Sequence, residues 1–198
     1  MKLLSRCAVL TFVLGIVAWT LGGVVAGEKK VKIGDKAPVL QGVDENGKPW
    51  KSTDVVGKKT LVLYFYPADF TGGCTAQACS FRDDIEKLHS QGIEVVGVSG
   101  DSVKTHHMFK DHHKLNFTLL ADEKGDLAKV FGVPVNKGGQ SPAIDGSGTK
   151  IMMDRGVTIN RYTVVIDKKG VVAAMDQVKD AKGDSKRIAE LVNKLDAK

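Results

Sequence analysis

Two largely apolar runs constrain the fold of this 198-residue chain more than any other feature. Residues 60–66 read TLVLYFY, and residues 93–98 read IEVVGV. A strand that is apolar on both sides is expected where helices cover both faces of a sheet. Between the two runs, Phe81, Ile85 and Leu88 recur at helical spacing and predict a helix over residues 76–90. The order strand, helix, strand therefore predicts an α/β fold.

The rest of the chain continues this alternation. Residues 162–166 and 171–175 flank a turn and predict two late strands, while residues 37–50 predict an N-terminal hairpin. Residues 132–161 are rich in Gly, Ser, Asn and Asp, so they predict a long surface loop. The whole pattern predicts a central mixed β-sheet flanked by helices, with further helices at 102–114, 126–131 and 185–195 and a further strand at 117–120.

The first 27 residues have the composition of a targeting segment rather than of a folded domain. Lys2 and Arg6 precede an apolar run that includes Cys7, and small residues follow at 24–27. This order is typical of a secretory signal peptide. An uncleaved membrane anchor is the alternative, because the run of about 20 apolar residues can span a bilayer. Both interpretations predict one exported domain over residues 28–198, periplasmic or secreted, with anchoring to the inner membrane under the alternative.

Charge and histidine content narrow the classes of partner. The formal net charge is +6, with acidic and basic residues interspersed and no long basic tract, so nucleic-acid binding is not expected. Zinc requires about four ligands, usually with cysteines two to four residues apart and a second Cys or His cluster. Adjacent histidines diverge around a helix, so most of the paired histidines should be solvated. We therefore expect neither a metal nor a cofactor; the histidines of the chain are His89, His106, His107, His112 and His113.

Two cysteines remain outside the targeting segment, Cys74 and Cys79. Cys74 follows the pair Gly72-Gly73 at the point where the strand at 60–66 ends and a helix begins. A thiolate in the first turn of a helix is stabilised by the helix dipole and by free backbone amides. The position therefore predicts a reactive thiolate, and an inert buried cysteine is the alternative.

The spacing of the two cysteines restricts how they can bond. With a rise of about 1.5 Å and a turn of about 100° per residue, side chains five residues apart point about 140° away from each other. Their α-carbons would lie about 8–9 Å apart, beyond the limit of about 7 Å for a disulfide. A bond between Cys74 and Cys79 therefore requires the first turns of the helix to unwind, which favours a pair that reacts over a permanent structural bridge.

The segment around these cysteines resembles the peroxiredoxins, specifically the bacterioferritin comigratory protein or peroxiredoxin Q subfamily. Pro67, Thr71 and Cys74 match the family signature, and Cys79 matches the second cysteine of the subfamily. The chain departs from the pattern at Gly72, where the family often has proline, and in its Gly-rich segment. Further matching segments are GDKAP at 34–38, VVGVSGDS at 95–102, FTLLAD at 117–122 and RYTVVID at 161–167.

The resemblance implies a thioredoxin-like fold and a role for each matched residue. Cys74 would be the peroxidatic nucleophile, and Cys79 would resolve its sulfenic acid within the same chain. The Thr71 hydroxyl would bond the thiolate or the incoming peroxide. Arg161 would bring a permanent cation to the pocket, and Pro67 would shield the thiolate and fix the loop.

The resemblance also implies the partners of the protein. These partners are a peroxide substrate and a thioredoxin-like dithiol reductant. The protein itself would be a monomer or weak dimer and would need no cofactor. The other class that fits the residues is an exported thioredoxin-like thiol–disulfide oxidoreductase or a redox-regulated binding module. The usual mark of that class is two cysteines separated by two residues, whereas four residues separate Cys74 from Cys79.

Overall fold

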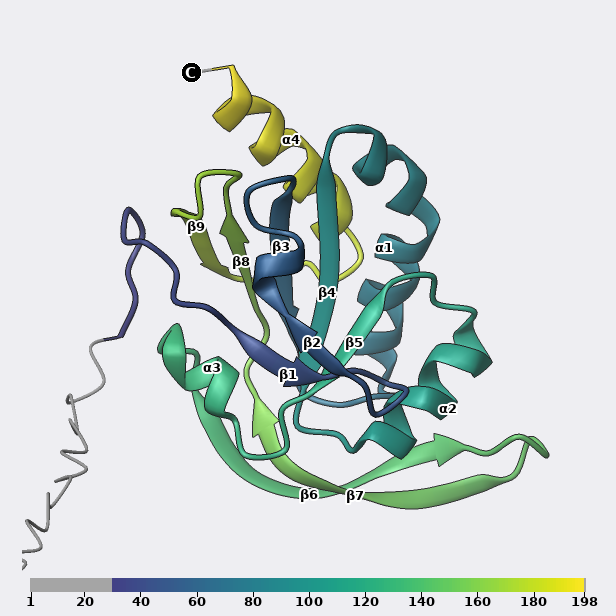
Figure 1. Ribbon diagram of the computed structural model, residues 1–198. Helices are drawn as coiled ribbons and strands as arrows, with labels where there is room; N and C mark the ends of the chain where they lie inside the picture. The colour runs from purple at the N-terminus through teal and green to yellow at the C-terminus, as the bar shows by residue number, and fades with distance from the viewer. Residues whose placement is uncertain (1–29, 198) are drawn as a thin grey trace, which may run out of the picture.

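A five-stranded mixed sheet in the order β5-β4-β3-β8-β9 forms the centre of the computed structural model, which describes residues 30–197 (Figure 1). β3 (Thr60–Phe65) pairs in parallel with β4 (Ile93–Ser99), which pairs in parallel with β5 (Thr118–Ala121). β8 (Tyr162–Ile166) runs antiparallel to β3 and to β9 (Val172–Gln177). Every residue of β3 is buried, as its apolar sequence predicts for a central strand.

Helices cover the two faces of this sheet, so the predicted α/β architecture is confirmed. Alternate residues of β3 point to opposite faces: Val62 and Tyr64 enter one core, and Leu61 and Leu63 enter the other. The first core is closed by α1 (Gly72–Ser90), α2 (Val103–His113) and α4 (Asp184–Asp196). The second core is closed by α3 (Asp126–Val130) and by the N-terminal hairpin.

The predicted N-terminal hairpin is present as a separate two-stranded sheet. β1 (Gln41–Val43) pairs antiparallel with β2 (Pro49–Lys51), and a short 3-10 turn, η1 (Ser52–Asp54), follows. The carboxylate of Asp44 accepts hydrogen bonds from two backbone amides of the connecting turn and thereby fixes its shape. Figure 1 shows the hairpin lying across the front of the sheet.

The prediction of a surface loop over residues 132–161 is wrong. The segment forms a long antiparallel ribbon of β6 (Val135–Ile144) and β7 (Lys150–Ile159), which curves beneath the sheet towards α2 (Figure 1). Two of the glycines in this ribbon serve close backbone contacts. A Cβ atom at Gly138 would lie 2.0 Å from the carbonyl oxygen of Arg155, and one at Gly156 would lie 2.2 Å from that of Glu123. Glycine therefore permits the packing of strands here and does not mark a loop.

The start of α1 also differs from the prediction of residue 76. The helix begins at Gly72, with Thr71 in extended conformation at the N-cap, so the glycine pair forms the first helical residues. In the loop before the helix, Phe70 has a positive φ of +56°, and its ring packs against the rings of Phe109 and His113. This aromatic packing holds a strained backbone conformation that bulky residues rarely adopt.

The predicted signal peptide or anchor, residues 1–27, lies outside the described residues. Within residues 30–197, no helix has both the length and the apolar character needed to cross a membrane.

Candidate active site

Cys74 lies in the first turn of α1, directly beyond the carboxyl end of β3. Its side chain is buried, with 2% of its surface exposed, while Cys79 is half-buried further along the same helix. Both cysteines are free thiols. Because both lie within one continuous helix, the spacing of about 8–9 Å expected for α-carbons five residues apart applies to them. The predicted placement at the junction of strand and helix is therefore confirmed.

Arg161 contacts the sulfur of Cys74. The residue immediately precedes β8, which pairs with β3, so the sheet carries its side chain to the start of α1. Its Nη2 donates to Cys74 Sγ at 3.1 Å, and its Nη1 donates to Oε1 of Gln77, one helical turn beyond the cysteine. A guanidinium at this distance stabilises the anionic form of a thiol.

Two other arginines near the motif are engaged elsewhere. Arg82 donates to the carbonyl oxygen of His113, and Arg155 donates to the hydroxyl of Thr158. Within the described residues, Arg161 is thus the arginine that the fold brings to Cys74.

The loop between β3 and α1 contains the other two predicted site residues. Pro67 is half-buried at its start, and its ring fixes one backbone angle there. The hydroxyl of Thr71 donates to the carbonyl oxygen of Ala68 at 2.9 Å. The Thr71 carbonyl accepts from the amide of Thr75 at 2.8 Å. The hydroxyl proton of Thr71 is therefore directed into the loop, and the lone pairs of the oxygen remain available to accept a hydrogen bond.

A buried ionic cluster supports this loop, and the sequence analysis did not identify it. Asp69, Asp101 and His106 are all fully buried. His106 Nδ1 lies 2.8 Å from the Asp69 carboxylate, and its Nε2 lies 3.1 Å from the carbonyl oxygen of Leu120. Both neighbours present acceptor oxygens, so these contacts favour the charged imidazole, in which both ring nitrogens donate. The Asp101 carboxylate accepts from the amide of Asp69 and from the hydroxyl of Ser99.

The electrostatics of the cluster follow from these contacts. Burial by itself would lower the pKa of His106, but the facing carboxylates of Asp69 and Asp101 outweigh it and raise that pKa above its usual value. Burial raises the pKa of Asp101, and the neighbouring charge of Asp69 raises it further. His106 is thus the buried exception to the expectation that most of the paired histidines are solvated, whereas the adjacent His107 is exposed.

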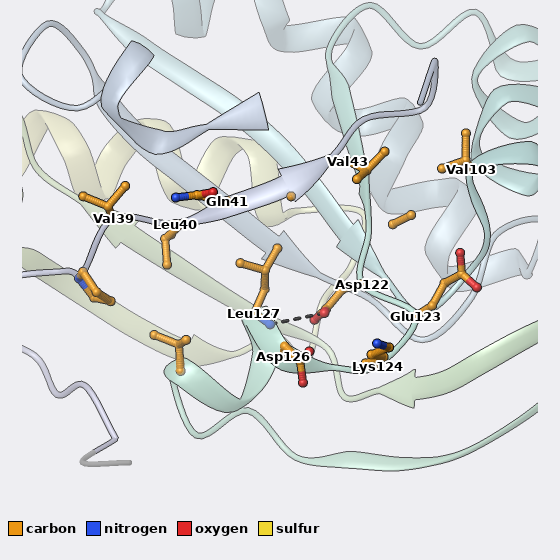
Figure 2. A pocket seen from close by; sticks show the side chains of 14 residues that line it. Val39, Leu40, Gln41, Val43, Val103, Asp122, Glu123, Lys124, Asp126 and Leu127 are labelled. Carbon is orange, nitrogen blue, oxygen red and sulfur yellow. Dashed lines mark hydrogen bonds between the residues drawn. The ribbon is translucent and has the colours of Figure 1, made fainter. Parts of the chain in front are cut away.

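No group of three His, Cys, Asp or Glu side chains in the described part of the chain is placed to hold a metal ion. A cavity of about 650 Å³ lies away from the cysteines, between β1, the end of β5 and α3 (Figure 2). Its buried acid, Asp122, accepts from the amides of Leu127 and Ala128 and so caps α3. That carboxylate is therefore committed to the fold.

Residues 33–175 match the profile of the AhpC/TSA family. The chain belongs to this family. It is 43% identical over 143 residues to a chloroplastic peroxiredoxin Q of Sedum lineare, covering 72% of this chain and 67% of that protein. It is 36% identical over 165 residues to a peroxiredoxin bcp of Coxiella burnetii, covering 83% of this chain and 99% of that protein. It spans only 60% of the chloroplastic peroxiredoxin Q of Triticum aestivum.

Solved structures give the same assignment. A PrxQ mutant of Xylella fastidiosa has a TM-score of 0.67 at 26% identity, covering 84% of this chain and 96% of that one. Peroxidoxin BcpB of Mycobacterium tuberculosis also has a TM-score of 0.67 at 26% identity, covering 82% and 97%. The peroxiredoxin resemblance and the thioredoxin-like fold are therefore confirmed, and the chain is assigned to an enzyme class of thiol-dependent peroxidases.

Proposed function

We propose that this protein reduces hydrogen peroxide and alkyl hydroperoxides, with Cys74 as the nucleophile, Cys79 as the resolving thiol and a thioredoxin-like dithiol as the reductant. The observation that carries the proposal is the 3.1 Å contact between Arg161 Nη2 and the buried sulfur of Cys74. A permanent cation at a buried thiol favours the thiolate, which is the nucleophilic form.

In the first step, the Cys74 thiolate attacks one oxygen of the peroxide. A sulfur–oxygen bond forms and the O–O bond breaks; the cysteine is oxidised to sulfenic acid, and the departing oxygen takes a proton and leaves as water or an alcohol. Arg161 offsets the negative charge that develops on the departing oxygen. Thr71 can accept the O–H of the incoming peroxide, because its own proton is donated to Ala68.

In the second step, the Cys79 thiol attacks the sulfenic sulfur of Cys74, a disulfide forms and water leaves. Since the two α-carbons are too far apart in the intact helix, the first turns of α1 must unwind before this bond forms. Exchange with an external dithiol then returns both cysteines to thiols.

A bacterioferritin comigratory protein of Xanthomonas campestris supports the inclusion of alkyl hydroperoxides. Its structure is described as giving insight into alkyl peroxide reduction activity, and it has a TM-score of 0.63 at 27% identity to this chain. The other class considered, a thiol–disulfide exchange protein, would reduce disulfides but would not consume peroxide at a comparable rate.

The test measures peroxide consumption with a dithiol donor for the wild type, Cys74→Ser and Cys79→Ser. Cys74→Ser should abolish turnover, while Cys79→Ser, treated with peroxide before the donor is added, should consume about one equivalent of peroxide and then stop. Oxidised wild type should be a monomer whose mass shows a bond between Cys74 and Cys79. Near wild-type turnover by Cys74→Ser would refute the assignment of the nucleophile. Disulfide-linked dimers as the main oxidised species would refute resolution within one chain.

We also propose that the domain is exported, because the order of charged, apolar and small residues over positions 1–27 is typical of a secretory signal peptide. The mass of the protein recovered from the exported fraction tests this proposal. A species lacking about 27 residues supports cleavage, and an intact chain in the membrane fraction supports anchoring. Recovery of the intact chain in the cytoplasmic fraction would refute export.

A further inference from the structure

The N-terminus of α4 contacts the part of α1 that contains the two cysteines. Asp184 and Ser185, the first two residues of α4, are fully buried. They bond to Gln77 and Ser80, which follow Cys74 in α1. We refer to the pairs Gln77–Asp184 and Ser80–Ser185 as the α4 clamp.

The first pair of the clamp joins the active-site arginine to α4. Gln77 Nε2 donates to the Asp184 carboxylate at 2.7 Å, while Gln77 Oε1 accepts from Arg161. Gln77 is fully buried, so neither end of its amide is open to solvent. One side chain therefore connects the cation at Cys74 to a carboxylate of another helix.

The second pair of the clamp is a directed chain of hydroxyls. The Ser185 hydroxyl donates to the carboxylate of Asp84 at 2.6 Å. Because that oxygen has one proton, the short contact of 2.5 Å between Ser80 and Ser185 has Ser80 as the donor. The chain thus links the early part of α1, at Ser80, to its later part, at Asp84, through the start of α4.

The clamp lies on and next to the segment of α1 that must unwind for resolution. A bond between Cys74 and Cys79 needs the segment between them to leave the helix, and Gln77 lies inside that segment while Ser80 follows it directly. We propose that the α4 clamp holds the first turns of α1 in the helix and that its release sets the rate of disulfide formation. The consequence for turnover rests on the proposed roles of the two cysteines.

The residues of α4 keep partners when the clamp opens. Asp184 retains hydrogen bonds from the Thr163 hydroxyl and from the guanidinium of Arg187. Ser185 retains its bond to Asp84. Opening therefore leaves no buried carboxylate unpaired, so no uncompensated buried charge adds to the cost of the hydrogen bonds that break. A clamp of this kind can close again when the disulfide is reduced.

The test uses Ser185→Ala, because Ser185 contacts neither Cys74 nor Arg161 nor Thr71. In the reduced protein, amide exchange of residues 74–80 should become about fivefold faster, the factor for one hydrogen bond of about 1 kcal/mol, while exchange in β3 and β4 stays unchanged. After one equivalent of peroxide, the Cys74–Cys79 bond should also form about fivefold faster by quenched-flow mass spectrometry. The rate constant of peroxide consumption should be unchanged.

Two further variants sharpen this experiment. Ser80→Ala removes the same bond from the α1 side and should reproduce both effects, and Ser80→Ala with Ser185→Ala should add little to either single change. Ser80 is half-buried, so this variant carries the test if Ser185→Ala does not fold. Ser90→Ala is the matched control: that exposed hydroxyl, at the end of α1, donates to the carbonyl of Lys87 and should change nothing.

Unchanged exchange of residues 74–80 in both Ser185→Ala and Ser80→Ala would overturn the clamp. Faster exchange with an unchanged rate of disulfide formation would overturn its control of resolution. Faster exchange in a protein whose wild type does not react with peroxide would support the clamp and refute the proposed function.

Discussion

Replacing His106 with alanine should remove about 3–5 kcal/mol from the free energy of unfolding. The side chain is fully buried and pairs with the buried carboxylate of Asp69 at 2.8 Å. Its removal leaves the Asp69 oxygen that faced it without this donor and leaves the carbonyl of Leu120 without its imidazole partner. The nearby Asp101 carboxylate adds a second negative charge, whose repulsion is then no longer offset.

The magnitude follows from the asymmetry between forming and breaking a buried pair. A buried ion pair adds little net stability, but the loss of one partner leaves the other charge unpaired in the interior, where water cannot solvate it. Since small domains have about 5–15 kcal/mol of stability in total, the variant should lose a large part of it. Asp69 belongs to the loop that carries Pro67 and Thr71, so the damage should also reach the active site.

Urea unfolding of His106→Ala and His107→Ala, followed by circular dichroism at pH 7, measures the difference. The neighbouring histidine is a matched control on the same helix: its side chain is 55% exposed and lies 3.4 Å from Asp111, also at the surface. A surface pair of this kind contributes about 0–1 kcal/mol. If the two variants differ by less than about 1 kcal/mol at equal m-values, the buried charge of His106 is not stabilising the loop as argued.

Three shorter predictions concern the site, the ribbon and pH. Arg161→Met should lower kcat/KM for peroxide by about 10²–10³-fold, with partial recovery in Arg161→Lys, measured by stopped-flow peroxide consumption. Gly100→Ala should lower Tm and reduce the free energy of unfolding by about 1–3 kcal/mol, because its Cβ would lie 2.1 Å from the carbonyl oxygen of Val157. Gly72→Ala is the control: its Cβ would have no atom within 4 Å, so it should not destabilise the fold. Because the pKa of His106 is raised in the folded protein, protonation of this side chain stabilises the fold. The contribution is fully present below the pKa of about 6.5 in the unfolded chain, and it is lost as the pH rises through the pKa in the folded protein. Titration of unfolding free energy should show that decline in the wild type and not in His106→Gln.

The parts of the fold that the sequence predicted correctly have local causes. β3 is a continuous apolar strand and β4 is largely apolar apart from Glu94, and this pattern is typical of strands covered on both faces. The position of Cys74 at the start of a helix follows from the end of a strand and the glycine pair before it, and the match of Arg161 to the family pattern identified the cation that contacts it.

The β6–β7 ribbon shows where local pattern misleads. Its glycines and polar residues are typical of a loop, but two of the glycines permit close backbone contacts, such as that of Gly156 with Glu123. Alternating exposure along β7 confirms a strand whose outer face is open to solvent. A composition rule cannot distinguish a glycine that frees the backbone from one that lets another backbone approach.

The polar networks around the site were decided by tertiary structure alone. His106 pairs with Asp69, 37 residues away, and Gln77 pairs with Asp184, 107 residues away. Nothing in the neighbouring sequence shows that these side chains are buried or that a partner of the right chemistry faces them. The hydrophobic pattern of a helix or strand depends on which of its own faces is covered, so it can be recognised in the local sequence. The pairing of buried charges depends on which elements meet, and the packed sheet and helices alone determine that.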